Sequence, residues 1–166
     1  MEPHSRQASS DQEAETQLRV IVMDPTWRKF VPHVVVLVSR AAHVAGLAAG
    51  SSVSLVLADD RLVRDLNMRH RGRNKPTNVL TYEHPAPELV LALGVIRREA
   101  AAAGRRLPHH LAHLVVHGAL HLLGFDHDHP GDARRMEMAE ARLLHRLGVP
   151  NPWKSAPRID AAGARP

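Results

Sequence analysis

Four segments of the chain contain apolar residues that either alternate with polar ones or form short uninterrupted runs. Runs of this length and pattern predict β-strands, whereas longer segments with apolar residues every three to four positions predict helices. The expected strands are 18–23, 53–57, 79–82 and 88–92. The expected helices are 26–48, a short one capped by Asp59 or Asp60, 94–103, 108–123 and a last one ending at Gly148.

This order of elements predicts an α+β fold in which four strands form a small sheet covered by about five helices. Pro32 is expected to break or kink the helix 26–48, and the polar, basic stretch 69–76 is expected to be a loop. Residues 1–16 are polar without an apolar period and are predicted to be a disordered extension. Residues 154–166 lack a core pattern and are predicted to be a flexible tail, which leaves one metal-binding catalytic domain at 17–153.

The composition of the 166-residue chain excludes several classes of protein. It has no cysteine, so disulfides and thiolate metal ligands are absent and any metal site must use His, Asp or Glu. The N-terminus shows no signal-peptide pattern and no apolar run is long enough to span a membrane, so a cytoplasmic protein without a membrane partner is expected. The formal net charge of +5 favours a polyanionic partner, but Arg-, Ala- and Pro-rich usage can also reflect coding bias, so local clustering matters more.

The helix predicted at 108–123 is apolar nearly all round, and therefore buried, yet it carries histidines. His117 and His121 lie one turn apart on one face, so both imidazoles can reach one metal ion. Gly124 can end the helix in a left-handed conformation and let the chain return His127 as a third ligand. This H-x-x-x-H-x-x-G-x-x-H spacing is that of the metzincin zinc motif. It predicts one catalytic zinc per chain on His117, His121 and His127, with a coordination position left open for water.

Two neighbouring positions refine this prediction. His113 is eight residues from His121, about 12 Å along the helix axis, so we expect it to pack or to support a ligand. In the protease motif H-E-x-x-H, the Glu after the first His is the general base, but that position here is Gly118. Peptide hydrolysis by that scheme is therefore disfavoured. Asp126, beside a ligand, could orient it or could be a turn residue.

Positive charge is concentrated in residues 61–75, which contain six Arg and Lys residues and one Asp. Their net charge of +5 equals the formal excess of the whole chain. Gly72 and Pro76 shape this segment, and Thr77 and Asn78 lead from it into a strand. Arginines presented beside a metal site suit phosphodiester chemistry, because they can stabilise developing negative charge. Aromatic residues make up only 3% of the chain, so RNA binding is expected to rest on backbone charge rather than base stacking.

Two motifs resemble one known family. The segment 66–82, LNMRHRGRNKPTNVLTY, is similar to the L-N-x-x-y-R-g-k-d-x-P-T-[DN]-V-L-S-F segment of the YbeY family of bacterial metal-dependent endoribonucleases. The segment 117–127, HGALHLLGFDH, is similar to the same family's H-G-x-L-H-L-x-G-[YF]-D-H signature. The resemblance runs in the same order from about residue 18 to residue 153. One departure is Pro87-Glu88, where the family usually has Gly-Asp.

The resemblance implies a compact α+β fold with a mixed sheet and zinc on His117, His121 and His127. It places Arg71 at the position of the family's arginine near the metal cleft, which makes Arg71 a candidate catalytic residue together with the three histidines. It implies a zinc-dependent, single-strand-specific endoribonuclease of late ribosome assembly, small-subunit rRNA maturation and ribosome quality control. The implied partners are ribosomal RNA, the small ribosomal subunit and ribosomal or assembly proteins.

Two other functions stay open at this point. One is a metal-dependent hydrolase of a non-RNA substrate such as a peptide or small ester, against which Gly118 speaks. The other is a ribosome-assembly binding protein with a structural zinc, against which the three-ligand count speaks.

Overall fold

The computed structural model describes residues 18–47, 52–126 and 128–154. The predicted extension 1–16, the predicted ligand His127 and the predicted tail apart from Lys154 lie outside these residues. The strands are β1 (Arg19–Val22), β2 (Ser54–Ala58), β3 (Val79–Tyr82) and β4 (Glu88–Ala92). The helices are α1 (Thr26–Phe30), α2 (Val34–Val44), α3 (Asp60–Arg71), α4 (Leu93–Ala102), α5 (Leu107–Leu122) and α6 (Pro130–Arg146).

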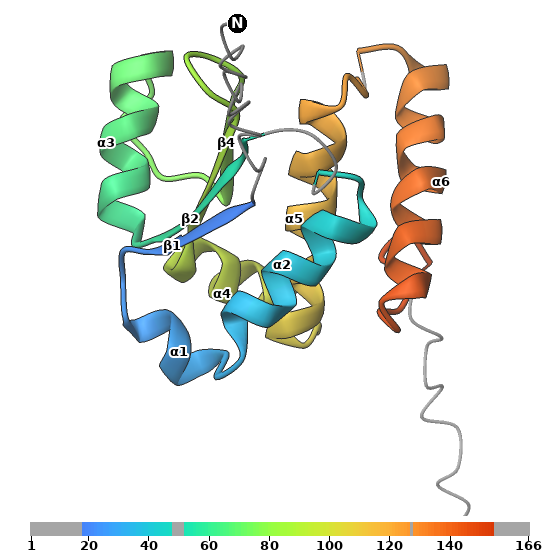
Figure 1. Cartoon of the computed structure of the whole chain (residues 1–166), viewed down its shortest axis with the longest axis horizontal. Coiled ribbons are helices and arrows are strands. Elements are labelled where there is room, and N and C mark those ends of the chain that lie inside the picture. The colour runs from blue at the N-terminus through green and yellow to red at the C-terminus, as the bar shows by residue number, and fades with distance from the viewer. Residues whose placement is uncertain (1–17, 48–51, 127, 155–166) are drawn as a thin grey trace, which may run out of the picture.

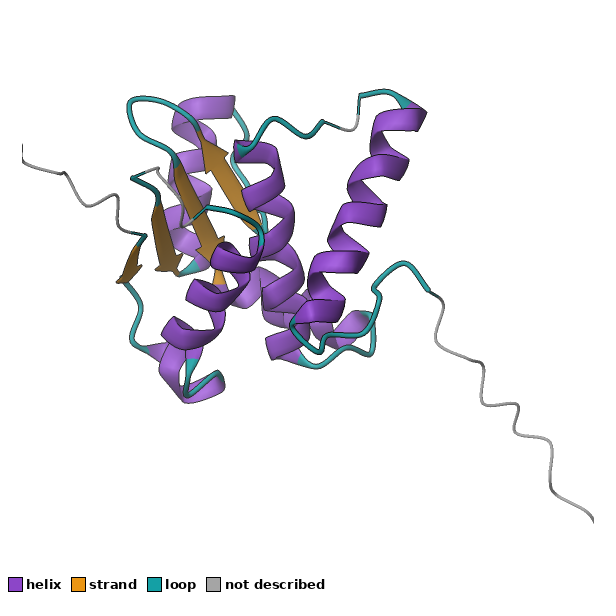
Figure 2. Cartoon of the chain, turned by 45° about the vertical axis from the view of Figure 1, so that its right-hand side comes forward, coloured by secondary structure: helices purple, strands orange, loops and turns teal. Residues whose placement is uncertain are grey.

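The strands form one mixed sheet in the order β1-β2-β4-β3. β1, β2 and β4 are parallel, and β3 pairs antiparallel with β4 at the edge of the sheet. The prediction of an α+β fold with a small four-stranded mixed sheet is therefore confirmed. Figure 1 shows α3 against one face of this sheet and α2 and α5 against the other, with α6 outside α5. Figure 2 shows the same layers with the strands enclosed between helices.

Alternation along the strands divides the core between these two layers. Leu55 and Leu57 of β2, with Leu89 and Leu91 of β4, join the large cluster that contains α2 and α5. The intervening residues of β2 and β4 join a smaller cluster that contains Val63 of α3. The larger cluster fixes α5 firmly against the sheet, and α5 carries the histidines of interest. Within the described residues, no helix has the length and apolar character needed to cross a membrane.

The helices α1 and α2 confirm the expected break at Pro32, because the chain leaves the helical conformation at 31–33, but α2 ends at Val44 rather than at 48. One prediction about a helix needs a larger correction. The predicted loop 69–76 begins too early, since Arg69 and Arg71 lie in the last turn of α3. Asp59 caps the start of this helix by accepting from Leu62 N–H at 2.8 Å, and Gly72, with a φ of 67°, ends it. The last turn is polar because it faces solvent, and basic side chains there interact favourably with the helix dipole.

Candidate metal centre and cleft

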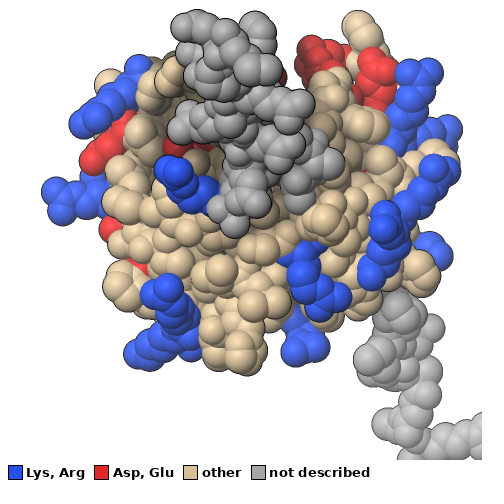
Figure 3. All heavy atoms as spheres, in the orientation of Figure 1, with Lys and Arg blue, Asp and Glu red and all other residues tan. Residues whose placement is uncertain are grey.

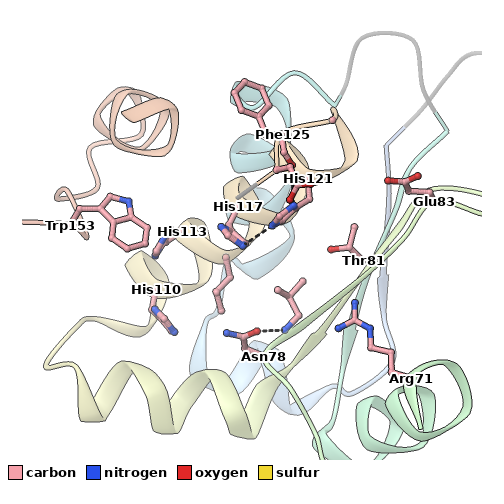
Figure 4. A pocket seen from close by; sticks show the side chains of 14 residues that line it. Arg71, Asn78, Thr81, Glu83, His110, His113, His117, His121, Phe125 and Trp153 are labelled. Atoms are coloured by element: carbon pink, nitrogen blue, oxygen red, sulfur yellow. Dashed lines mark hydrogen bonds between the residues drawn. The ribbon is translucent and has the colours of Figure 1, made fainter. Parts of the chain in front are cut away.

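A cavity of about 780 Å³ opens between α5, β3 and the end of α3. Four histidines of α5 line it at positions 110, 113, 117 and 121, spaced by three, four and four residues on one helix face. Figure 4 shows His117 and His121 near the middle of the cavity, with Arg71 and Thr81 on the facing side. The structure thus brings two of the three predicted zinc ligands together with Arg71.

The turn after α5 forms as the sequence predicted. Gly124 adopts a φ of 92°, a conformation that favours glycine, and Phe125 N–H donates to Leu120 O at 3.0 Å across the helix end. This turn brings the carbonyl oxygen of Phe125 to His121, whose Nδ1 lies 3.1 Å away. Because a carbonyl oxygen can only accept, His121 Nδ1 carries the proton and donates.

A buried carboxylate orients His117 in the same way. Glu140 of α6 is 1% exposed, and its Oε1 lies 2.5 Å from His117 Nδ1. Its other oxygen accepts from His113 Nε2 and from Trp153 Nε1, each at 3.0 Å. Burial alone would raise the pKa of Glu140, but the hydrogen bonds from His113 and His117 outweigh it and lower the pKa to about 2. The carboxylate is therefore ionised at neutral pH and can only accept, so His117 Nδ1 is the donor.

If each ring is neutral, these two contacts leave its Nε2 as the nitrogen available to a metal ion. His117 Nε2 and His121 Nε2 lie 3.1 Å apart. Two nitrogen ligands of a tetrahedral zinc, each at about 2.1 Å, are separated by about 3.4 Å. The spacing and the tautomers of this pair therefore fit a shared zinc ion. The contact of one ring nitrogen with a carboxylate or carbonyl, while the other faces the metal, is the usual arrangement of zinc-binding histidines.

The third predicted zinc ligand, His127, cannot be placed beside His117 and His121. Among the residues that the structure describes, no three His, Cys, Asp or Glu side chains are grouped to hold a metal ion. The three-histidine site therefore remains a prediction. The structure places two of its members, His117 and His121, side by side. Asp126 lines the same cavity.

The position after His117 shows why a protease-like general base is absent. A Cβ atom at Gly118 would lie 2.7 Å from Leu89 Cδ2 of β4, much closer than real side chains approach. Gly118 therefore faces the sheet and permits close packing of α5. A glutamate at this position would point into the core and away from the cleft.

Arg71 is the only residue of the basic segment 61–75 among those described as lining the large cavity. Arg71, Arg73 and Lys75 also line an adjoining cavity of about 240 Å³, so the two cavities share Arg71. Lys and Arg side chains are also spread around the edge of the face shown in Figure 3, including over α6. The positive charge next to the cleft itself comes from Arg71, Arg73 and Lys75.

A second histidine–carboxylate pair lies at the other end of the histidine row. His110 Nε2 is 2.9 Å from Glu99 Oε2 of α4, and Asn78 Nδ2 donates to the same oxygen at 3.1 Å. Asn78 Oδ1 accepts from Val79 N–H at 2.7 Å. These contacts attach the start of β3 to α4 and α5, which holds the wall of the cleft in place.

Glu140 and Trp153 were not predicted as site residues. A signal for Glu140 existed, because Met136, Glu140 and Leu144 follow one another at four-residue intervals on the buried face of α6. A carboxylate in an apolar stripe requires buried hydrogen-bond donors. Trp153 gave no such signal, since its contact with Glu140 arises only when the chain folds back after α6.

Comparison with known proteins identifies one family and one shared fold. Residues 12–148 match the family model described as "Endoribonuclease YbeY". The chain is 45% identical over 175 aligned positions to a protein named Endoribonuclease YbeY from Gluconobacter oxydans, covering 99% of both chains. It is 35% identical to one with the same name from Rhodopseudomonas palustris, covering 95% of this chain and 92% of the relative. The solution structure of TM1509 from Thermotoga maritima shares the fold, with a TM-score of 0.54 at 18% identity over 86% of this chain and 99% of that one.

Proposed function

Because this chain belongs to the YbeY family of endoribonucleases, we propose that it hydrolyses single-stranded RNA with one zinc ion bound by His117, His121 and His127. The proposed substrate is small-subunit ribosomal RNA in the cytoplasm, during late ribosome assembly and ribosome quality control. The small ribosomal subunit and its assembly proteins are the proposed partners. The observation that supports zinc most directly is the pair of Nε2 atoms 3.1 Å apart, each opposite a ring nitrogen that donates to a fixed acceptor.

Each residue of the cleft has a distinct part in this proposal. A bound zinc ion would polarise a phosphate oxygen and promote ionisation of water near neutral pH. Glu140 and the Phe125 carbonyl keep the Nε2 lone pairs of His117 and His121 directed into the cleft. Arg71 faces these rings across the cavity and would donate charge-assisted hydrogen bonds to a phosphate. Such bonds lower the barrier if they strengthen as negative charge develops in the transition state.

The geometry favours RNA over a peptide as the substrate. The site has cationic donors for a phosphate at Arg71 and, in the adjoining cavity, at Arg73 and Lys75. It has no carboxylate at position 118, and the side of α5 that this position occupies is packed against β4. A phosphodiester therefore meets complementary cationic groups here, whereas the site lacks, at position 118, the general base that the related zinc motif uses for peptide hydrolysis.

One comparison tests the proposal against both alternatives. Zinc-loaded wild-type protein, His117→Ala and His121→Ala are assayed on single-stranded RNA and on an unstructured peptide. His145→Ala is the matched control, because His145 is an exposed histidine on α6. We expect RNA cleavage by wild type and His145→Ala only. Cleavage of the peptide instead would indicate a different hydrolase, and bound zinc with no cleavage of either substrate would indicate a structural metal.

A further inference from the structure

Two exposed aromatic side chains line the cleft beside the histidines. The chain has only two Trp, one Tyr and two Phe residues, yet Phe125 and Trp153 both line the 780 Å³ cavity. Trp153 is 48% exposed and Phe125 is 39% exposed. In Figure 4, Trp153 and Arg71 lie at opposite ends of the cavity, with His117 between them. A substrate that spans the cleft from Arg71 past His117 therefore reaches the indole ring.

The indole ring is held in a fixed orientation although about half of it is exposed. Its Nε1–H donates to the buried carboxylate of Glu140 at 3.0 Å. The ring also packs edge to face against His113, with 5.6 Å between ring centroids and 85° between ring planes. The polar atom of the side chain is thus satisfied by protein, while apolar ring surface remains at the cavity. A ring fixed in this way loses little conformational entropy when a planar group stacks on it.

We propose that Trp153 is a stacking platform for an unpaired nucleobase of the bound RNA, with Phe125 as additional aromatic surface in the same cleft. This inference rests on the proposed function, and it replaces the expectation that binding depends on backbone charge alone. Arg71, Arg73 and Lys75 supply contacts for phosphates, which do not distinguish single from double strands. A platform for a base face does distinguish them, because a base within a duplex is already stacked on both faces. Trp153 would thereby contribute to a preference for single-stranded RNA.

The proposal predicts a specific pattern among substitutions at Trp153. Trp153→Leu removes the aromatic face and should weaken binding of a short single-stranded RNA by about 5- to 150-fold. Trp153→Phe lacks the Nε1 donor but keeps an aromatic face. Because the face is what stacks on a base, this variant should retain most of the affinity for RNA. Met138→Ala is the matched control, because Met138 is an apolar side chain on α6 that is 50% exposed. Zinc content and melting temperature are measured for every variant.

The ligand provides a test that leaves the protein intact. Single nucleotides of the RNA are replaced in turn by abasic sites. At one position in the RNA, this replacement should reduce the affinity of wild type. The same replacement should have little further effect on the affinity of Trp153→Leu. Binding is followed by rapid mixing before cleavage proceeds. In wild type, stacking should also quench the fluorescence emission of Trp153. The change can be assigned to Trp153 because the other tryptophan, Trp27, is fully buried.

The possible failures are distinguishable. If wild type binds RNA but neither Trp153→Leu nor any abasic site changes the affinity, the platform is refuted and the proposed function stands. If Trp153→Phe loses as much affinity as Trp153→Leu, the contribution comes from the hydrogen bond to Glu140, and the stacking role is likewise refuted. If wild type binds no RNA at all, both the platform and the proposed function fail.

Discussion

Glu140 is the residue whose substitution best tests how the proposed zinc site is supported. Its carboxylate accepts from His113, His117 and Trp153 and is 1% exposed. In Glu140→Gln the amide has one oxygen to accept with, and its NH₂ group would face at least one of these N–H donors. The amide orientation with fewer clashes keeps the oxygen toward His113 and Trp153 and turns the NH₂ group toward His117, which would then lose the contact that fixes its tautomer. Loss of such a supporting carboxylate lowers metal affinity by roughly 10- to 100-fold, equivalent to about 1.4 to 2.7 kcal/mol.

The same change should destabilise the metal-free protein, because a buried donor left without an acceptor costs about 1–3 kcal/mol. Glu140→Ala leaves all three donors without this acceptor and should cost more, on the order of 3–5 kcal/mol. Zinc affinity is measured by competition with a chromophoric chelator, and the free energy of unfolding by urea denaturation of metal-free protein. Glu137→Gln is the matched control, since Glu137 precedes Glu140 by three residues on α6 and is only half-buried. If Glu140→Gln binds zinc as tightly as Glu137→Gln, Glu140 does not position a ligand.

Three further predictions concern the cleft wall, the basic segment and the packing of α4. Arg71→Ala should keep its zinc but reduce single-turnover RNA cleavage by roughly 10²-fold, and Arg71→Lys should rescue it poorly; normal cleavage at saturating protein would leave Arg71 only a binding role. Replacing Arg69, Arg73 and Lys75 together by Ala should flatten the dependence of log affinity on log salt by up to about 2 units, at about 0.7 per phosphate contact, and an unchanged slope would place the RNA elsewhere. Gly94→Ala should destabilise the protein by about 1–2 kcal/mol in urea denaturation, because its Cβ would lie 2.4 Å from Asp60 Oδ2 and displace the carboxylate that accepts from Val95 N–H. Gly131→Ala, at the matching second position of α6 with nothing within 4 Å, should be neutral or stabilising, and equal losses in the two variants would refute the steric argument.

The features predicted from the sequence are those that depend on local periodicity. The i, i+4 spacing of His117 and His121 specifies a shared helix face, and Gly124 specifies the turn, so both could be predicted without the tertiary structure. The continuation of α3 through Arg71 was missed because exposed helical turns and loops are equally polar, although Gly72 marked the helix end. The acceptor for His117 Nδ1 comes from Glu140, 23 residues away on another helix. No local pattern pairs these two residues, since their contact depends on how α5 and α6 pack.

The position of Trp153 also could not be predicted from the sequence. A low aromatic content predicts RNA binding through backbone charge, but composition does not show where the few aromatic residues lie. Packing of 151–153 against His113 and Glu140 places the indole at the cleft. The fold therefore concentrates a rare residue type at the site.

One zinc ion on His117, His121 and His127 is proposed to be required for RNA cleavage. Protein purified without an affinity tag is stripped of metal, and single-turnover cleavage of a single-stranded RNA is measured while zinc is added back in steps. We expect no cleavage without metal and a rise that ends at one equivalent per chain, with neither bound zinc nor cleavage recovered in His121→Ala or His127→Ala. Full cleavage by the metal-free protein would contradict this requirement. So would a zinc titration in which His121→Ala and His127→Ala still bind one equivalent and recover cleavage as wild type does.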